Sequence, residues 1–161
     1  MILALGFFIL QQETHISPPP SISDLIGQSS YVLAPITKSG KIIIIHEKNG
    51  KPFLVTAGTY VDAPAEVAYK IISDYENWDK FVPTVKKIKP VERLREERSI
   101  WEYNLSLKVS ILQINLKYYL EHHYEKAPTR IWWHSADDYE SDIDEVIGAW
   151  DIIPVQQPFL E

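Results

Sequence analysis

Residues 61–83 read VDAPAEVAYKIISDYENWDKFVP, and this stretch decides the fold. Pro64 suits the first position of a helix, and Glu66 stands where a capping-box acid would reach back to the start of that helix. The apolar residues that follow recur at helical spacing and predict a core-facing stripe. It is made of Val67, Ala68, Ile71 and Ile72, and it continues into the second helix with Tyr75, Trp78 and Phe81. The stretch therefore predicts a strand that runs directly into two short helices, the second ending at Pro83.

Aromatic residues accompany both predicted helices. Tyr69, Trp78 and Phe81 are large, apolar and placed toward the same side, so we expect them to be buried as a plug over a sheet. Maintenance of the fold explains such a plug without any ligand. The aromatic residues of this stretch therefore identify an architecture and not a function.

A β-hairpin is predicted before the helices. Residues 41–47 form a β-branched run, residues 53–61 form a second strand-like run, and Asn49-Gly50 between them is a strong hairpin turn. The second run leads into Pro64, so the predicted helices follow a strand of an antiparallel pair.

Strand patterns return after the helices. Residues 101–109 and 112–124 alternate apolar and polar side chains with a period of two, which predicts two long, half-buried strands joined by a tight turn. Residues 129–135 and 146–155 are rich in aromatic and β-branched residues and predict two more strands. Strands, then helices, then an antiparallel meander are typical of an α+β protein.

Residues 61–83 resemble a motif of the START-like superfamily, which contains polyketide cyclases, coenzyme Q-binding proteins and pollen-allergen-type ligand binders. In that superfamily the helix begins with Ala-Pro and the second helix carries Trp-x-x-Phe-x-Pro, as in Ala63-Pro64 and in residues 78–83. Gly148-Ala149-Trp150 resembles the Gly-x-Trp of a late strand. The resemblance covers about residues 52–155 and implies a helix-grip fold, in which a curved antiparallel sheet grips a long C-terminal helix.

The same resemblance implies an apolar cavity between sheet and helices that holds a hydrophobic small molecule, such as a lipid, a quinone or a polyketide-like compound. Alternation along the strands selects the inward residues expected to line it, which are Trp101, Tyr103, Leu105, Leu116, Tyr118, Trp132 and Trp150. Plain core packing is the alternative for each of them. Two other functions stay open: a cyclase or dehydratase-type enzyme using Tyr103 or His134 as a proton donor, and a protein-interaction domain.

Composition excludes several classes of protein. The 161 residues include 16 Lys and Arg against 22 Asp and Glu, a net charge of −6, and the basic residues are scattered. Nucleic acid is therefore not an expected partner, because phosphate binding needs a concentrated positive field. The chain has no cysteine, which excludes disulfides, thiolate metal sites and a cysteine nucleophile. No cofactor is expected.

Histidines are the candidate metal ligands. His122 and His123 are adjacent, and neighbouring residues of a strand point to opposite faces, so at most one of them joins His134. No third ligand stands at a convincing spacing, so we expect no metal site. The acidic residues between 137 and 145 lack the glycine and terminal glutamate of a calcium-binding EF-hand loop and predict a solvated turn.

The two ends of the chain leave alternatives open. Residues 1–10 are almost wholly apolar and resemble the core of a secretory signal without its positively charged start, so the chain is either exported (periplasmic or secreted) or begins with a disordered or packed terminus and is cytoplasmic. We assign residues 1–30 to this segment and a linker, and residues 31–161 to the START-like domain. The closing strand and C-terminal helix of the superfamily are missing before Glu161, so we expect either a truncated product or a fold that a partner or a swapped segment completes.

Overall fold

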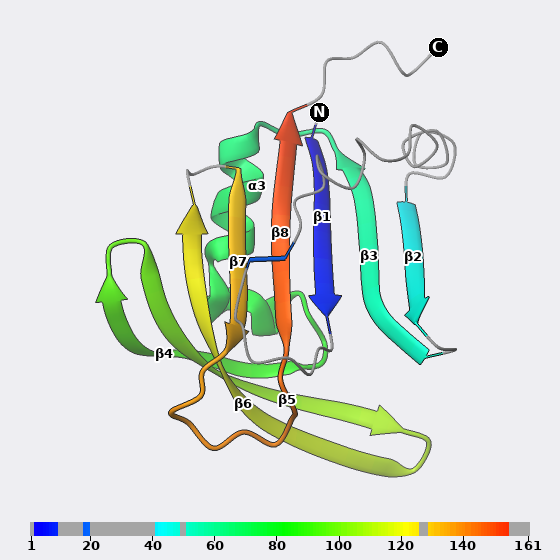
Figure 1. Cartoon of the computed structure of the whole chain (residues 1–161), viewed down its shortest axis with the longest axis vertical. Coiled ribbons are helices and arrows are strands. Elements are labelled where there is room, and N and C mark those ends of the chain that lie inside the picture. The colour runs from blue at the N-terminus through cyan, green and yellow to red at the C-terminus, as the bar shows by residue number, and fades with distance from the viewer. Residues whose placement is uncertain (1, 10–17, 20–40, 49–50, 126–128, 155–161) are drawn as a thin grey trace.

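The computed structural model describes residues 2–9, 18–19, 41–48, 51–125 and 129–154. Within these residues eight strands form one antiparallel sheet in the order β2-β3-β1-β8-β7-β6-β5-β4 (Figure 1). The strands are β1 (Ile2–Ile9), β2 (Lys41–Lys48), β3 (Lys51–Val61), β4 (Val85–Arg95), β5 (Arg98–Val109), β6 (Leu112–Glu125), β7 (Arg130–Ser135) and β8 (Ile147–Pro154). The mostly antiparallel sheet predicted from the sequence is confirmed.

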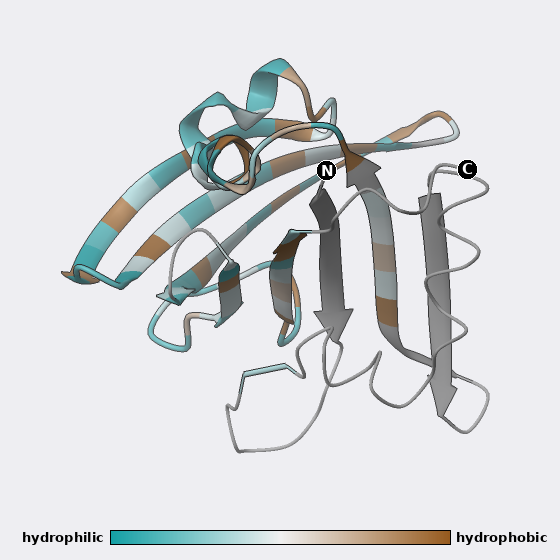
Figure 2. Ribbon diagram, turned by 90° about the horizontal axis from the view of Figure 1, so that it is seen from above, coloured by the Kyte–Doolittle hydropathy of each residue, from teal (hydrophilic) through white to brown (hydrophobic). Residues whose placement is uncertain are grey.

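Two helices in series connect β3 to β4, as the sequence predicts. They are α3 (Ala65–Ser73) and the 3-10 helix η1 (Tyr75–Lys80). The carbonyl of Pro64 accepts the first backbone hydrogen bonds of α3, and no side chain caps this end. Both helices lie on one face of the sheet, which bends so that β4–β6 turn away from β3 (Figure 2). This is the α+β, START-like arrangement that the sequence predicts.

The two predicted hairpins are present. β2 pairs with β3, and β5 pairs with β6 along the whole length of β5, from Arg98–His123 to Val109–Leu112. Ser110 begins the tight turn of the second hairpin with φ of 57°, the left-handed conformation that such a turn requires. The Asn49-Gly50 turn predicted for the first hairpin lies outside the described residues.

Two strands were not predicted. Strand β1 lies between β3 and β8 and pairs with both, whereas the sequence analysis placed residues 1–30 outside the domain. Strand β4 is an edge strand with Pro90 near its middle, and most of its side chains are exposed.

None of the helices in the described part of the chain is long and apolar enough to cross a membrane.

The predicted helix stripe is only partly correct. Ala68 is buried against Ile152 of β8 and Ile72 packs against both, but Val67 and Ile71 are 44% and 53% exposed. Because α3 rests on the sheet through one narrow strip, its flanking apolar residues face outward.

The predicted aromatic plug also needs correction. Tyr75, which was expected on the core-facing stripe but not in the plug, is 1% exposed, whereas Phe81 is 54% exposed. Tyr75 and Trp78 are three residues apart and share one side of the 3-10 helix, while Phe81 is its C-cap residue, where the backbone leaves the helical conformation. Tyr69 and Trp78 are half-buried.

Candidate functional site

The two faces of the sheet carry different side chains. We call the face that bears α3 and η1 the inner face, and the opposite one the outer face. Tyr75 of η1 contacts the rings of Trp101, Tyr103 and His122, which places these three residues on the inner face. On the outer face, His123 stacks on Trp132 with ring centroids 3.7 Å apart.

A groove of about 900 Å³ opens on the inner face between α3 and the β4–β6 part of the sheet. Its floor and helical wall come from Tyr69 of α3, Trp101 of β5 and Tyr124 of β6. The other lining residues are mostly polar or charged and include Ser73, Ser99, Glu92, Arg93, Glu96 and Glu97. This volume is within the range of sites that bind small organic molecules.

The polar atoms on the groove floor are paired with one another. The indole Nε1 of Trp101 donates to Ser99 Oγ at 2.7 Å and to the Tyr124 hydroxyl at 3.1 Å, and the latter two oxygens lie 2.9 Å apart. Since these groups satisfy each other, the floor offers aromatic ring surface to a ligand without leaving polar atoms unpaired.

A compact aromatic core lies beside the groove. His122 is fully buried, with Nδ1 2.8 Å from the Tyr75 hydroxyl and Nε2 3.1 Å from the Tyr103 hydroxyl. A cavity of only about 70 Å³ remains among the core rings. The residues that line this cavity are Tyr75, Trp78, Tyr103, Tyr118, Leu120, His122, Trp133 and Trp150.

Burial controls the protonation of this core. It lowers the pKa of His122 to about 3, with a smaller contribution from His123 and His134, so the imidazole is neutral at pH 7. One ring nitrogen then donates a hydrogen bond and the other accepts one. Burial also raises the pKa of Tyr118 to about 12 and the pKa values of Tyr75 and Tyr103 well above the ordinary tyrosine range. Both hydroxyls bonded to His122 therefore stay protonated.

The seven residues predicted to line one cavity are distributed over separate places. Trp101 lines the large groove. Tyr103, Tyr118 and Trp150 surround the 70 Å³ core cavity. Leu105 and Leu116 lie at a third cavity of about 240 Å³, near the turn end of the β5–β6 hairpin.

The predicted inward position of Trp132 is wrong, because this side chain lies on the outer face. Trp133 pairs with His122 across β6 and β7 and thus takes the inner position, while Trp132 pairs with His123. Both tryptophans are buried, so alternation of hydrophobicity could not tell which of them points inward.

Of the residues that line the groove only Trp101 was predicted, and the other two aromatic ones, Tyr69 and Tyr124, were not. Tyr124 continues the alternation of Tyr118, Leu120 and His122 along β6, and that signal was present in the sequence. Tyr69 was assigned to a plug, but it lines the groove as part of its helical wall. Burial raises the pKa of the Tyr69 hydroxyl, which is therefore also protonated at neutral pH.

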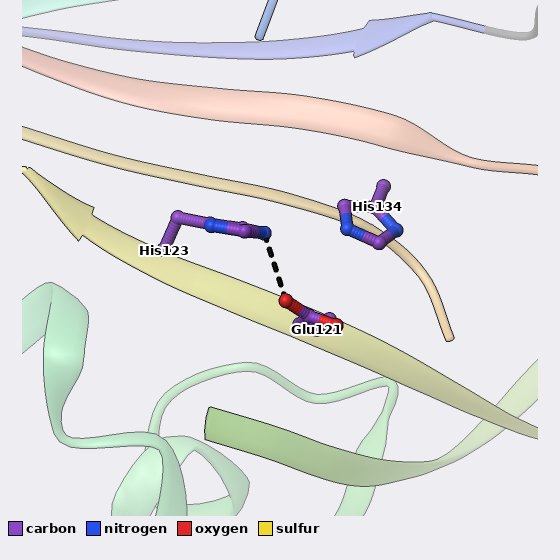
Figure 3. Close-up of side chains that lie close together, drawn as sticks. All are labelled: Glu121, His123 and His134. Carbon is purple, nitrogen blue, oxygen red and sulfur yellow. Dashed lines mark ion pairs between the residues drawn. The ribbon is translucent and has the colours of Figure 1, made fainter. Parts of the chain in front are cut away.

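The outer face carries a cluster of potential metal ligands. As predicted, His122 and His123 point to opposite faces, and His123 lies near His134, with ring centroids 5.3 Å apart. The sequence analysis found no third ligand, but Glu121 lies beside both histidines (Figure 3). Burial lowers the pKa of His123 to about 4, although the Glu121 carboxylate opposes this shift.

A comparison with known proteins agrees with this architecture. A family described as "Polyketide cyclase / dehydrase and lipid transport" matches residues 61–157, more than half of the 161 residues. No curated protein and no solved structure matches the chain. The matched region begins at the last residue of β3 and includes both helices, the groove and the aromatic core. The chain thus belongs to the polyketide cyclase / dehydrase and lipid transport family, a START-like family.

Proposed function

We propose that the protein binds a hydrophobic small molecule of the lipid, quinone or polyketide-like class in the groove between α3 and β4–β6. Membership of the family supports a hydrophobic ligand but does not identify which one. The observation that carries the proposal is the groove of about 900 Å³, whose aromatic floor has its polar atoms already paired. Apolar binding sites combine such a floor with a few polar groups that orient the ligand.

Charges at the groove lie away from its floor. Glu92, Arg93, Glu96 and Glu97 are exposed residues of β4 and of the turn that follows it. Three glutamates and one arginine make this part of the groove net acidic, which disfavours an anionic ligand. We expect the apolar part of the ligand to lie on Trp101 and Tyr124, and its polar end to lie near these charges, in contact with water.

The alternative of a cyclase or dehydratase-type enzyme has less support. The buried Tyr75, His122 and Tyr103 would be its natural proton-transfer groups, but they surround a cavity of about 70 Å³. This volume corresponds to about two water molecules, so a polyketide-like substrate does not fit. His134, the other candidate proton donor, lies with His123 and Trp132 on the outer face. Binding is therefore favoured over catalysis.

Replacing Trp101 with leucine is expected to weaken binding of an apolar fluorescent probe roughly tenfold, because a large aromatic contact in the groove floor is lost. Titration of the full chain with the probe, followed by its emission, measures the effect. The same result is expected for Tyr124→Leu. Tyr119→Leu is the matched control, since Tyr119 is also on β6 but stacks on Tyr139, 4.7 Å away between ring centroids, outside the groove.

Salt and temperature provide a second check on the same site. Burial of apolar surface predicts a negative heat-capacity change of binding and an affinity that changes little with ionic strength. If Trp101→Leu and Tyr124→Leu both bound the probe as the parent protein does, or if affinity fell steeply with salt, the groove would not be the ligand site. A protein-docking role, with a partner or swapped segment covering this face, would then be the better hypothesis.

A further inference from the structure

The cluster on the outer face has the composition of a metal site (Figure 3). Glu121 and His123 come from β6 and His134 from β7, and one potential ligand atom of each lies within 4.8 Å of the others. The strand register explains this proximity, because Glu121 pairs with His134 and His123 is two residues further along the same face of β6. We propose that Glu121, His123 and His134 bind one divalent transition-metal ion such as Zn²⁺.

The ligand set decides the type of metal. Two imidazole nitrogens and one carboxylate oxygen suit Zn²⁺ and its first-row neighbours, whereas Mg²⁺ and Ca²⁺ prefer oxygen ligands alone. Three protein ligands leave the fourth tetrahedral position to water. Zinc bonds of about 2.0–2.1 Å place ligand atoms about 3.3 Å apart. From separations of up to 4.8 Å, the side chains need to close in by at most about 1.5 Å.

Neighbouring groups already orient the two histidines. Nδ1 of His134 donates to the backbone carbonyl of Ser135 at 2.7 Å, which leaves Nε2 unprotonated in the neutral ring and available to a metal. The ring of His123 stacks on Trp132 at an interplanar angle of 7°, so its plane is held by packing. Such outer-sphere contacts are typical of metal-binding histidines.

His123 supplies an independent observation. Its Nε2 is buried and makes no hydrogen bond within the described residues, although Glu121 Oε1 lies only 3.1 Å away. The contact with Glu121, drawn in Figure 3, is thus not a hydrogen bond, and a buried nitrogen that makes no hydrogen bond destabilises the fold. A metal ion between His123, Glu121 and His134 would provide the missing interaction.

Arg98 is expected to influence the affinity of this site for a metal ion. Its Nε donates to Glu121 Oε1 at 2.7 Å, and its Nη2 donates to the same oxygen. The guanidinium orients the carboxylate, but its positive charge opposes a bound cation. Removal of this charge with retention of a hydrogen-bond donor, as in Arg98→Gln, should therefore tighten metal binding several-fold.

The test uses the full chain without a histidine tag, stripped with a chelator and titrated with ZnCl₂ by calorimetry. We expect one Zn²⁺ per chain, and a loss of affinity of more than roughly tenfold in Glu121→Gln and in His134→Asn. Glu125→Gln, an exposed glutamate on the same strand, is the matched control and should bind as the parent does. Co²⁺ should give the visible absorption bands of a tetrahedral site, and these bands should disappear in the same two variants.

Circular dichroism establishes that each variant is folded before titration. If His134→Asn does not fold, Glu121→Gln and Arg98→Gln decide the question, because they change affinity in opposite directions. The proposal is overturned if Zn²⁺ does not bind at millimolar concentration, if Mg²⁺ binds equally well, or if Glu121→Gln and Arg98→Gln both leave the affinity unchanged. Probe binding to the groove on the inner face is an independent measurement and is not expected to respond to these variants.

Discussion

Replacement of Tyr75 with alanine is expected to lower the free energy of unfolding by about 3–5 kcal/mol, the usual penalty for emptying a large aromatic position in a core. Tyr75 is 1% exposed and lies within 4.6–6.4 Å of the ring centroids of Trp78, Trp101, Tyr103 and His122. It thereby joins η1 to β5 and β6. Loss of this ring removes contacts to all four neighbours and leaves His122 without one hydrogen-bond partner.

Urea unfolding measures this effect, and Phe81→Ala is its matched control. Phe81 is an aromatic residue six positions further along, but it is 54% exposed, and its truncation should change stability by no more than about 0.5 kcal/mol. The loss of stability in Tyr75→Phe should lie between those of Tyr75→Ala and Phe81→Ala, since this variant keeps the ring and loses only the hydroxyl. Equal urea midpoints for Tyr75→Ala and Phe81→Ala would contradict the placement of Tyr75 at the centre of the core.

Replacement of His122 with leucine is the second change with a large expected effect, a loss of roughly 2–5 kcal/mol. The hydroxyls of Tyr75 and Tyr103 both bond to the imidazole in the buried core, at 2.8 and 3.1 Å. Leucine has a similar volume but cannot accept or donate a hydrogen bond. Two buried hydroxyl groups would lose their imidazole partner, at about 1–3 kcal/mol each.

A triple variant distinguishes this cause from altered packing. If lost hydrogen bonds account for the effect, His122→Leu combined with Tyr75→Phe and Tyr103→Phe should recover a large part of the stability, because the removal of all partners together is nearly neutral. Additive losses in the triple variant would instead mean that ring packing is the cause. Urea midpoints of the single, double and triple variants form the cycle that measures this coupling.

The sequence predicted the helices and the hairpins because their patterns are regular. Pro64 starts α3 next to a strand, and β5 and β6 alternate apolar and polar residues throughout their inner parts. Strand β4 has no such alternation, because its pairing with β5 shifts register at three points, and each extra residue breaks the period of two. Strand β1 is a short apolar run, and hydrophobicity alone does not distinguish a central strand from a signal segment.

The candidate site was less predictable because it depends on register between strands. Which of Trp132 and Trp133 faces inward is decided by pairing with His122 and His123, and a sequence does not contain that pairing. The same register brings Glu121 beside His134. Inward strand positions also do not share one cavity, since Trp101 lines the groove, whereas Leu105 and Leu116, further along the β5–β6 hairpin, line another cavity.

Strand β4 also bears on how copies of this protein behave at high concentration. An unpaired strand edge is a template for another chain, and a continuous edge favours aggregation. Here the pairing of β4 shifts register at three points, and Pro90 lacks the backbone N–H that a neighbour would need. Exposed charges occupy much of the rest, namely Lys86, Lys87, Lys89, Glu92, Arg93 and Arg95. The edge beside the groove is thereby protected from edge-to-edge association, and this groove wall stays open to solvent without offering a template for fibril growth along β4.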